Sequence, residues 1–322
     1  MLRRARDKFR ITRARRLSRL ASSSNLPSAQ HRRGKPKVTI DYEAEYNNRA
    51  RVPDHPVHMA GWARDAEAYR SEMSKSEGRA ELGLSYGPSE RQFIDLFFPD
   101  DAEGAPLALF IHGGYWRALD PRSHSHVARG LNAHGVIVGV AGYDLCPKVT
   151  ISEIVDQIRK ASLFLWERFN RKILVYGHSA GGHLAACMLA TDWRTLDPTA
   201  PDDLVPAAYA ISGLFDLAPL VETAMNQDLR LTPAEARRIS PLFWPAPRGR
   251  ILDAVVGGAE SSEYLRQSRS ITESWGKQQV ETRYEAVPGE NHFGVIAPLA
   301  DPRSAMVERL VALSKRVQPE TG

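Results

Sequence analysis

The chain has 322 residues, of which 43% are hydrophobic and 25% charged, a composition typical of a globular protein with a substantial core. No apolar run approaches the ~18 residues that a membrane-spanning helix needs, so we expect no transmembrane segment. The two cysteines, Cys146 and Cys187, argue against a disulfide framework or a cysteine-based metal site and favour a reducing compartment, which predicts a cytoplasmic protein.

The net charge of +5 is unevenly distributed along the chain. Residues 1–37 contain thirteen Lys or Arg and one acidic residue, which leaves 30 basic and 37 acidic residues for the remainder. The basic start lacks the apolar stretch of a secretory signal, so we expect residues 1–38 to be a disordered extension. A transit peptide, or an arm that touches anionic lipid or nucleic acid, is the alternative. Because the remainder is acidic, no nucleic-acid partner is expected for the folded domain.

Residues 39–88 are expected to form an N-terminal arm and a helix near the active site. The arm is rich in loop-forming residues, and the helix begins at about Pro56. Polar and aromatic side chains at residues 41–42 and 46–48 are placed to reach a pocket.

From residue 89 onward, apolar runs typical of strands alternate with helical patterns. Such alternation predicts one α/β domain over residues 89–322, with a mostly parallel central sheet covered by helices on both faces. A stretch rich in proline around 217–250 is expected to form a short cap-like insertion. The predicted strands are 92–98, 107–111, 136–141, 173–176, 207–211, 251–256 and 282–287, and the predicted helices are 124–134, 151–169, one through 184–189, one from Thr232, 264–275 and 305–317.

The sequence GHSAG at 177–181 is a G-x-S-x-G motif between a predicted strand and a predicted helix. This context places Ser179 at the apex of a sharp turn, where its hydroxyl is exposed as a nucleophile. The two glycines avoid collisions across the turn.

A serine nucleophile needs a general base and a group that orients the base. His292 follows a predicted strand in a glycine-rich loop, and we expect it to be the base. Glu260, just after the strand 251–256, is the expected acid. Asp216, after the preceding strand, is the alternative acid, whereas Asp253 lies inside its strand.

Acyl transfer also needs hydrogen-bond donors that stabilise the oxyanion, the negatively charged oxygen of the tetrahedral intermediate. The segment HGGYW at 112–116 follows a predicted strand, and the amides of Gly113 and Gly114, with that of Ala180, are expected to form the oxyanion hole. Tyr115 and Trp116 are expected to bind the substrate. We expect no metal ion, because the pair of histidines at 124 and 126 has no accompanying ligand, and no cofactor, because no phosphate-binding or dinucleotide motif occurs.

With these residues in place, the chain resembles the α/β-hydrolase superfamily and, more narrowly, the kynurenine formamidase (arylformamidase) branch and its bacterial esterase relatives. The resemblance covers residues 39–318 and is carried by HGGYW, by GHSAGGHL at 177–184 and by VVGGAESSEYLRQS at 255–268. It implies the α/β-hydrolase fold and a triad of Ser179, Glu260 and His292. One departure is that eukaryotic kynurenine formamidases have aspartate at the acid position.

The resemblance implies a serine hydrolase that cleaves a small-molecule amide or ester through an acyl-enzyme. An arylformamide such as N-formylkynurenine is the first candidate substrate, and a short-acyl carboxylester is the second. An alternative of another class is a non-catalytic ligand-binding protein on the same fold. A homodimer is a further possibility.

Overall fold

The computed structural model describes residues 39–317, so the predictions for the extension of residues 1–38 lie outside the described residues. The described strands are β1 Ala80–Ser85, β2 Phe93–Phe97, β3 Leu107–Ile111, β4 Ile137–Ala141, β5 Ile173–His178, β6 Ala207–Ile211, β7 Ile251–Gly257 and β8 Glu281–Val287. The described α-helices are α1 Tyr42–Tyr46, α2 Asn48–Arg51, α3 His55–Ser74, α4 Arg129–Asn132, α5 Ile151–Phe169, α6 Ala180–Leu189, α7 Asn226–Leu229, α8 Pro233–Arg238, α9 Ser262–Gly276 and α10 Ala305–Val317. Short 3₁₀ helices are η1 Pro121–Ser123, η2 Ser125–Ala128, η3 Trp193–Thr195, η4 Ala218–Glu222, η5 Pro241–Phe243 and η6 Gly294–Ala300.

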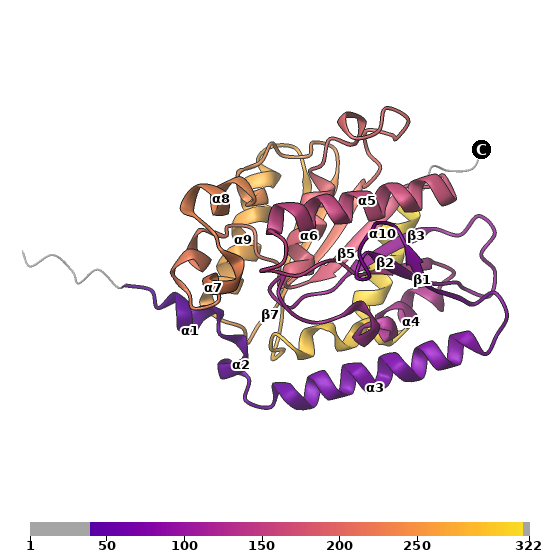
Figure 1. The fold of residues 1–322 in the computed structure, drawn as a ribbon, viewed down its shortest axis with the longest axis horizontal. Helices are drawn as coiled ribbons and strands as arrows, with labels where there is room; N and C mark the ends of the chain where they lie inside the picture. The colour runs from indigo at the N-terminus through magenta and orange to yellow at the C-terminus, as the bar shows by residue number, and fades with distance from the viewer. Residues whose placement is uncertain (1–38, 318–322) are drawn as a thin grey trace, which may run out of the picture. The chain divides into compact units, whose positions relative to one another are not determined.

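All the described strands belong to one sheet with the order β1-β2-β4-β3-β5-β6-β7-β8 (Figure 1). The strands from β4 to β8 in this order pair in parallel, and β1 and β2 extend one end of the sheet in antiparallel pairing. This is the α/β-hydrolase fold, and it confirms the predicted fold class. The carboxyl ends of the parallel strands share one edge, where such sheets build their sites.

Both faces of the sheet are covered by helices. Successive residues of a strand point to opposite faces, and in the central strand β3 they enter two different hydrophobic clusters. In β3, Leu107, Leu109 and Ile111 belong to a hydrophobic cluster with α5, α6 and α9. Ala108 and Phe110 belong to a second cluster with α3, α4 and α10. Burial on both faces explains why the central strands are continuous apolar runs.

Helix α5 shows how closely local sequence specifies an element. Thr150 and Glu153 form a reciprocal capping box at its start, and Asn170 ends it in the left-handed conformation at φ 50°. Both signals are common at helix ends. The observed bounds match the predicted helix.

Three segments differ from the sequence-based expectation. The arm contains two short helices, α1 and α2, whose first turns are capped by the side chains of Asp41 and Asn47. Strand β1 was not predicted, because its side chains lie at an edge and are mostly half-buried or exposed. The helix predicted at 124–134 is divided between η2 and α4.

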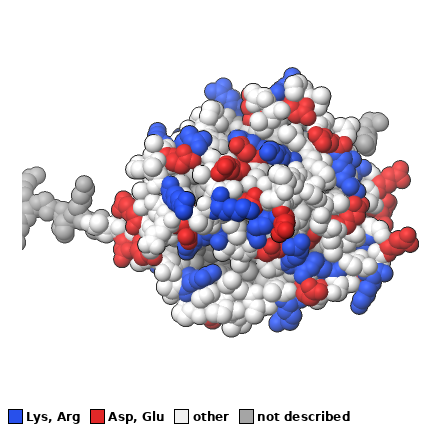
Figure 2. Space-filling view, viewed as in Figure 1, with Lys and Arg blue, Asp and Glu red and all other residues white. Residues whose placement is uncertain are grey.

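Basic and acidic side chains are interspersed on the face of the molecule shown in Figure 2. Within residues 39–317, no helix is long and apolar enough to cross a membrane.

Candidate active site

Ser179 lies between β5 and α6 with φ 58° and ψ −118°, a strained backbone conformation for a residue with a side chain. The flanking glycines make this turn sterically feasible. A Cβ atom on Gly177 would lie 2.4 Å from the carbonyl oxygen of Gly181, and one on Gly181 would lie 1.9 Å from the carbonyl oxygen of Ile111. The glycine spacing therefore allows the sharp turn that has Ser179 at its apex.

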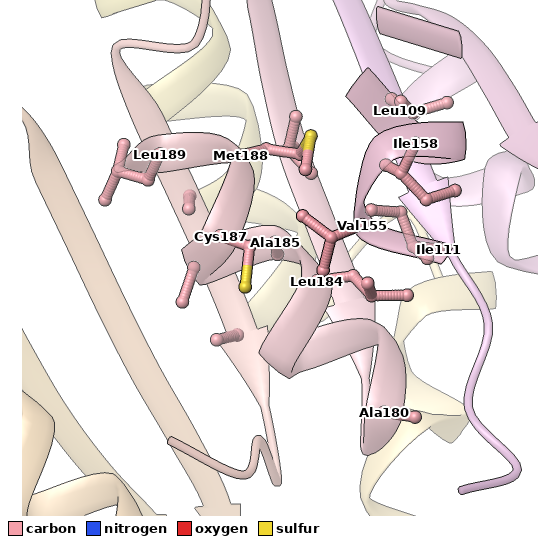
Figure 3. Packing of buried hydrophobic residues seen from close by; sticks show 14 of the residues in the cluster. Leu109, Ile111, Val155, Ile158, Ala180, Leu184, Ala185, Cys187, Met188 and Leu189 are labelled. Atoms are coloured by element: carbon pink, nitrogen blue, oxygen red, sulfur yellow. The ribbon is translucent and has the colours of Figure 1, made fainter. Parts of the chain in front are cut away.

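Helix α6 is buried along its whole length and anchors this turn. Figure 3 shows Leu184 and Met188 of α6 packed near Val155 and Ile158 of α5. The first amides of a helix have no intrahelical acceptor, and the N-terminal end of a helix carries a partial positive charge. The amide of Ala180 begins the helix directly after Ser179, where an anion would be stabilised.

His292 and Glu260 meet at the same edge of the sheet. His292 follows β8, Glu260 follows β7, and His292 Nδ1 lies 2.6 Å from Glu260 Oε2, with both side chains buried. A carboxylate can only accept, so Nδ1 carries the proton and Nε2 is left as the basic nitrogen. The other oxygen of Glu260 accepts hydrogen bonds from the Gly257 amide at 2.7 Å and from the Ser212 hydroxyl.

The alternative acid, Asp216, is engaged elsewhere. Its carboxylate accepts from the amide of Ala218 at 3.2 Å and lies 3.8 Å from the guanidinium of Arg266. Asp253 is fully buried within β7 and pairs with Arg309 of α10. Glu260 is therefore the acid that the structure brings to His292.

Ser179 and His292 line one cavity of about 540 Å³. The arm supplies one part of its wall, including Tyr46, Asn48 and Arg49. The stretch around α7 supplies another, including Met225, Gln227 and Asp228. A cavity of this size accommodates a small organic molecule.

Within the segment 112–116, Gly113 lies against the nucleophile. A Cβ atom on Gly113 would lie 3.0 Å from Cβ of Ser179, and one on Gly114 would lie 2.2 Å from the carbonyl oxygen of Ala118. Gly114 has φ 101°, a conformation that favours glycine. The structure thus places Gly113 against Ser179 and Gly114 in the wall of the cavity that Ser179 lines, and Ala180 follows the serine directly.

The two aromatic residues of this segment point to different surroundings. Tyr115 lines the cavity. Trp116 is fully buried and is not among the lining residues, and its ring meets that of His183 edge-on at 5.0 Å between centroids. The expectation that both side chains bind substrate therefore fits Tyr115 alone, because Trp116 packs into the core.

His178, the residue before the nucleophile, was not recognised from the sequence. Its ring lies 4.7 Å from that of His292 between centroids, and its Nε2 is 2.9 Å from the backbone carbonyl oxygen of His292. Burial lowers the pKa of His178 well below the usual histidine range, so the ring is neutral and Nε2 donates. This bond fixes the backbone that carries the basic histidine.

A cluster of hydroxyl and amide groups adjoins Ser179. Asn48 Nδ2 lies 2.9 Å from the hydroxyl oxygen of Tyr264 and 3.3 Å from that of Tyr115. The two hydroxyls are 2.5 Å apart, and the Tyr115 hydroxyl donates to the carbonyl oxygen of Tyr46 at 2.7 Å. Residues 46–48 line the cavity, as predicted, whereas residues 41–42 are not among its lining residues. Tyr264 lies inside the segment 255–268 that carries the resemblance, but it was not singled out, because a tyrosine at a buried helical position is typical of core packing.

Comparisons with known proteins agree with the fold described above. The sequence profile of the α/β-hydrolase fold matches residues 108–295. A kynurenine formamidase from Salmo salar is 31% identical over 241 residues, covering 72% of this chain and 81% of that protein. A kynurenine formamidase from Danio rerio is 28% identical, covering 76% and 85%. Among solved structures, a candidate thioesterase from a Silicibacter species is 35% identical, with a TM-score of 0.74 and coverage of 84% of this chain and 98% of that chain.

Proposed function

Because this chain belongs to the α/β-hydrolase family and, within it, to the relatives of kynurenine formamidase, we propose that it hydrolyses a small arylformamide through an acyl-enzyme. The protein is a hydrolase with arylformamidase or esterase activity. N-formylkynurenine is the proposed substrate, since formamidase is the activity named for two of its relatives.

In the proposed mechanism, Ser179 Oγ attacks the formyl carbon while His292 Nε2 takes the serine proton. Glu260 holds His292 through Nδ1 and stabilises the imidazolium. Protonated His292 then gives its proton to the departing amine as the C–N bond breaks. Water, activated by His292, hydrolyses the formyl ester of Ser179 and releases formate.

The amides of Gly113, Gly114 and Ala180 form the proposed oxyanion hole. Each such donor typically contributes ~3 kcal/mol to the stability of the transition state. Tyr115 contacts the substrate in the cavity. The stretch 217–250 acts as the proposed cap, in keeping with the cavity-lining positions of Met225, Gln227 and Asp228.

The observation that carries this proposal is that His292, held by Glu260 at 2.6 Å, lines the same cavity as Ser179. The test is steady-state kinetics on N-formylkynurenine beside p-nitrophenyl acetate and butyrate, with Ser179→Ala as the blank. We expect kcat/KM on the formamide of at least ~10⁴ M⁻¹s⁻¹, within the usual enzyme range. A Ser179→Ala variant with full activity would rule out the mechanism.

A short-acyl carboxylesterase is the second candidate function. It is supported by the solved candidate thioesterase, since a thioesterase also cleaves an acyl ester and not an amide. Activity on the p-nitrophenyl esters without activity on the formamide would select this function.

Location and assembly are further proposals. We place the protein in the cytoplasm because Cys146 and Cys187 are buried free thiols, and cell fractionation tests this. The homodimer is tested by light scattering coupled to size-exclusion chromatography. We assign no nucleic-acid partner to the folded domain, and a binding assay with residues 39–322 tests this.

A further inference from the structure

Ser212, which directly follows β6, is a fully buried serine with a strained backbone. Its φ is 51°, in the left-handed region that a residue with a side chain rarely adopts. It is not among the residues that line the cavity. Strain of this kind is typical of functional sites, so the contacts of this hydroxyl bear on what Ser212 does.

The Ser212 hydroxyl is bound to the proposed acid. It donates to Oε1 of Glu260, which also accepts from the amide of Gly257 at 2.7 Å. The other oxygen, Oε2, faces His292 Nδ1 at 2.6 Å. A carboxylate can only accept, so the direction of each of these bonds is fixed. Two donors therefore hold one oxygen of Glu260 and leave the other for the imidazole.

The carboxylate of Glu260 depends on these hydrogen bonds because it is shielded from water. Its side chain is 1% exposed, and a buried charge is stabilised only by the groups that contact it. Hydrogen bonds to charged groups are stronger than those between neutral groups. The loss of the Ser212 donor would therefore leave the carboxylate both less stabilised and freer to turn away from His292.

The same end of β6 also contacts the nucleophile. The amide of Ser179 donates to the carbonyl oxygen of Ile211 at 2.8 Å. The next residue, Ser212, is fixed by its own amide, which donates to the carbonyl oxygen of Val255 in β7 at 2.7 Å. Two successive residues thus connect the turn that carries Ser179 with the acid, and the sheet sets the position of both.

We propose that Ser212 is a positioning residue for the acid, and that its hydroxyl holds the carboxylate of Glu260 against His292 Nδ1 during turnover. A glutamate has one more rotatable bond than an aspartate, and the Ser212 hydroxyl together with the Gly257 amide restricts that freedom. The inference rests on the serine-hydrolase mechanism proposed above. Because Ser212 lies outside the cavity, it acts on kcat and not on substrate binding.

The first test is Ser212→Ala, which keeps Cβ and removes the hydroxyl. We expect kcat to fall roughly 10- to 100-fold, the effect of a lost hydrogen bond to a charged group, while KM changes less than about twofold. The same loss is expected on N-formylkynurenine and on p-nitrophenyl acetate, for whichever of them the wild-type protein cleaves. Ser179→Ala provides the background rate.

Ser212→Gly separates the hydroxyl from the strained backbone. Glycine adopts a positive φ without strain, so this variant should be at least as stable as Ser212→Ala in urea unfolding and yet lose kcat to the same extent. The matched control is Ser162→Ala, since Ser162 is a buried serine of α5 whose hydroxyl donates to the carbonyl oxygen of Ile158 at 2.9 Å. Its kcat should stay within about twofold of the wild type. A Ser212→Gly variant with wild-type kcat would overturn the inference.

A double-mutant cycle shows whether Ser212 acts through the acid. In a Glu260→Gln background, Ser212→Ala should lower kcat less than about threefold, because the charge that Ser212 holds in place is already gone. Losses that multiply in full, or an unchanged kcat in Ser212→Ala, would overturn the inference while the proposed hydrolase function stands. A wild-type protein that cleaves neither substrate would overturn the proposed function, and the inference with it.

Discussion

Ser179 reaches the cavity because two neighbouring residues lack side chains. The closest hypothetical contact is at Gly181, where a Cβ atom would meet the backbone of Ile111 rather than a movable side chain. Packed backbone atoms cannot move aside as the flexible end of a side chain can. Residue 181 therefore cannot carry a side chain without displacing the backbone.

The Gly181→Ala variant should lose about 3 kcal/mol or more of the free energy of unfolding, because the added methyl must push α6 away from β3. Urea unfolding followed by circular dichroism measures this loss. The control is Gly61→Ala in α3, where the nearest atom to the new Cβ is 3.8 Å away. That variant should be neutral or stabilised by up to ~1 kcal/mol, and equal losses in both would contradict the steric argument.

The choice between Glu260 and Asp216 is also decided at the scale of single residues. Glu260→Gln keeps the size of the side chain but removes the charge that stabilises the imidazolium of His292. We expect kcat to fall roughly 10³- to 10⁴-fold, as in other triads that lose their acid. In the Asp216→Asn variant, kcat should fall less than about threefold. Kinetics on the preferred substrate decides, and the opposite ranking would assign the acid to Asp216.

At the scale of elements, the sheet is held to its covering helices by both apolar contacts and ion pairs. Asp253 of β7 is fully buried, and Arg309 of α10 contacts both of its oxygens, at 2.7 and 2.9 Å. Arg316 on the same helix pairs with Glu281 at an exposed position. The two arginines therefore offer an internal comparison of buried and exposed pairs.

Arg309→Ala should cost about 3–5 kcal/mol of the free energy of unfolding, because it removes both hydrogen bonds of Arg309 to the buried carboxylate of Asp253 and leaves Arg283 beside it at 3.4 Å. Arg316→Ala should cost less than about 1 kcal/mol, since an exposed pair gains little. Chemical unfolding of the two variants under identical conditions makes the comparison. Similar costs would show that burial does not set the strength of these pairs.

Elements of the fold differ in how clearly their sequence predicts them. Central strands and α5 were predicted well, since continuous burial and capping residues leave strong local signals. Strand β1 was missed because an edge strand has no such pattern, and α1 and α2 are too short to show helical periodicity, although Asp41 and Asn47 are capping residues. Tyr264 was not singled out, because its contact with Asn48 depends on the packing of α9 against the arm, which no local sequence pattern shows.

At the scale of the whole molecule, burial governs the response to acid. Burial lowers the pKa of His124 to about 3 and the pKa values of His126 and His183 to about 4. In an unfolded chain histidine titrates near pH 6.5. The folded state therefore keeps neutral histidines over a pH range in which the unfolded state binds protons.

The free energy of unfolding should be highest above pH 6.5, where both states are neutral at these sites. It should fall as the pH drops from 6.5 toward 4, because the unfolded state alone gains protons, with up to ~1.4 kcal/mol lost per pH unit for each histidine. Urea unfolding at pH 7, 6, 5 and 4.5 measures the slope. His126→Gln should make the slope shallower, and an unchanged slope would show that His126 does not take part.

The arm that carries Tyr46 and Asn48 also limits where a shortened recombinant protein can begin. The family match begins at residue 108, so a shortened version designed on that boundary would start after the arm and after β1 and β2. Such a protein would keep Ser179, Glu260 and His292 yet lack part of the cavity wall. Its β4 would lose the β2 partner and become a bare edge open to aggregation. Recombinant versions should therefore start before Asp41.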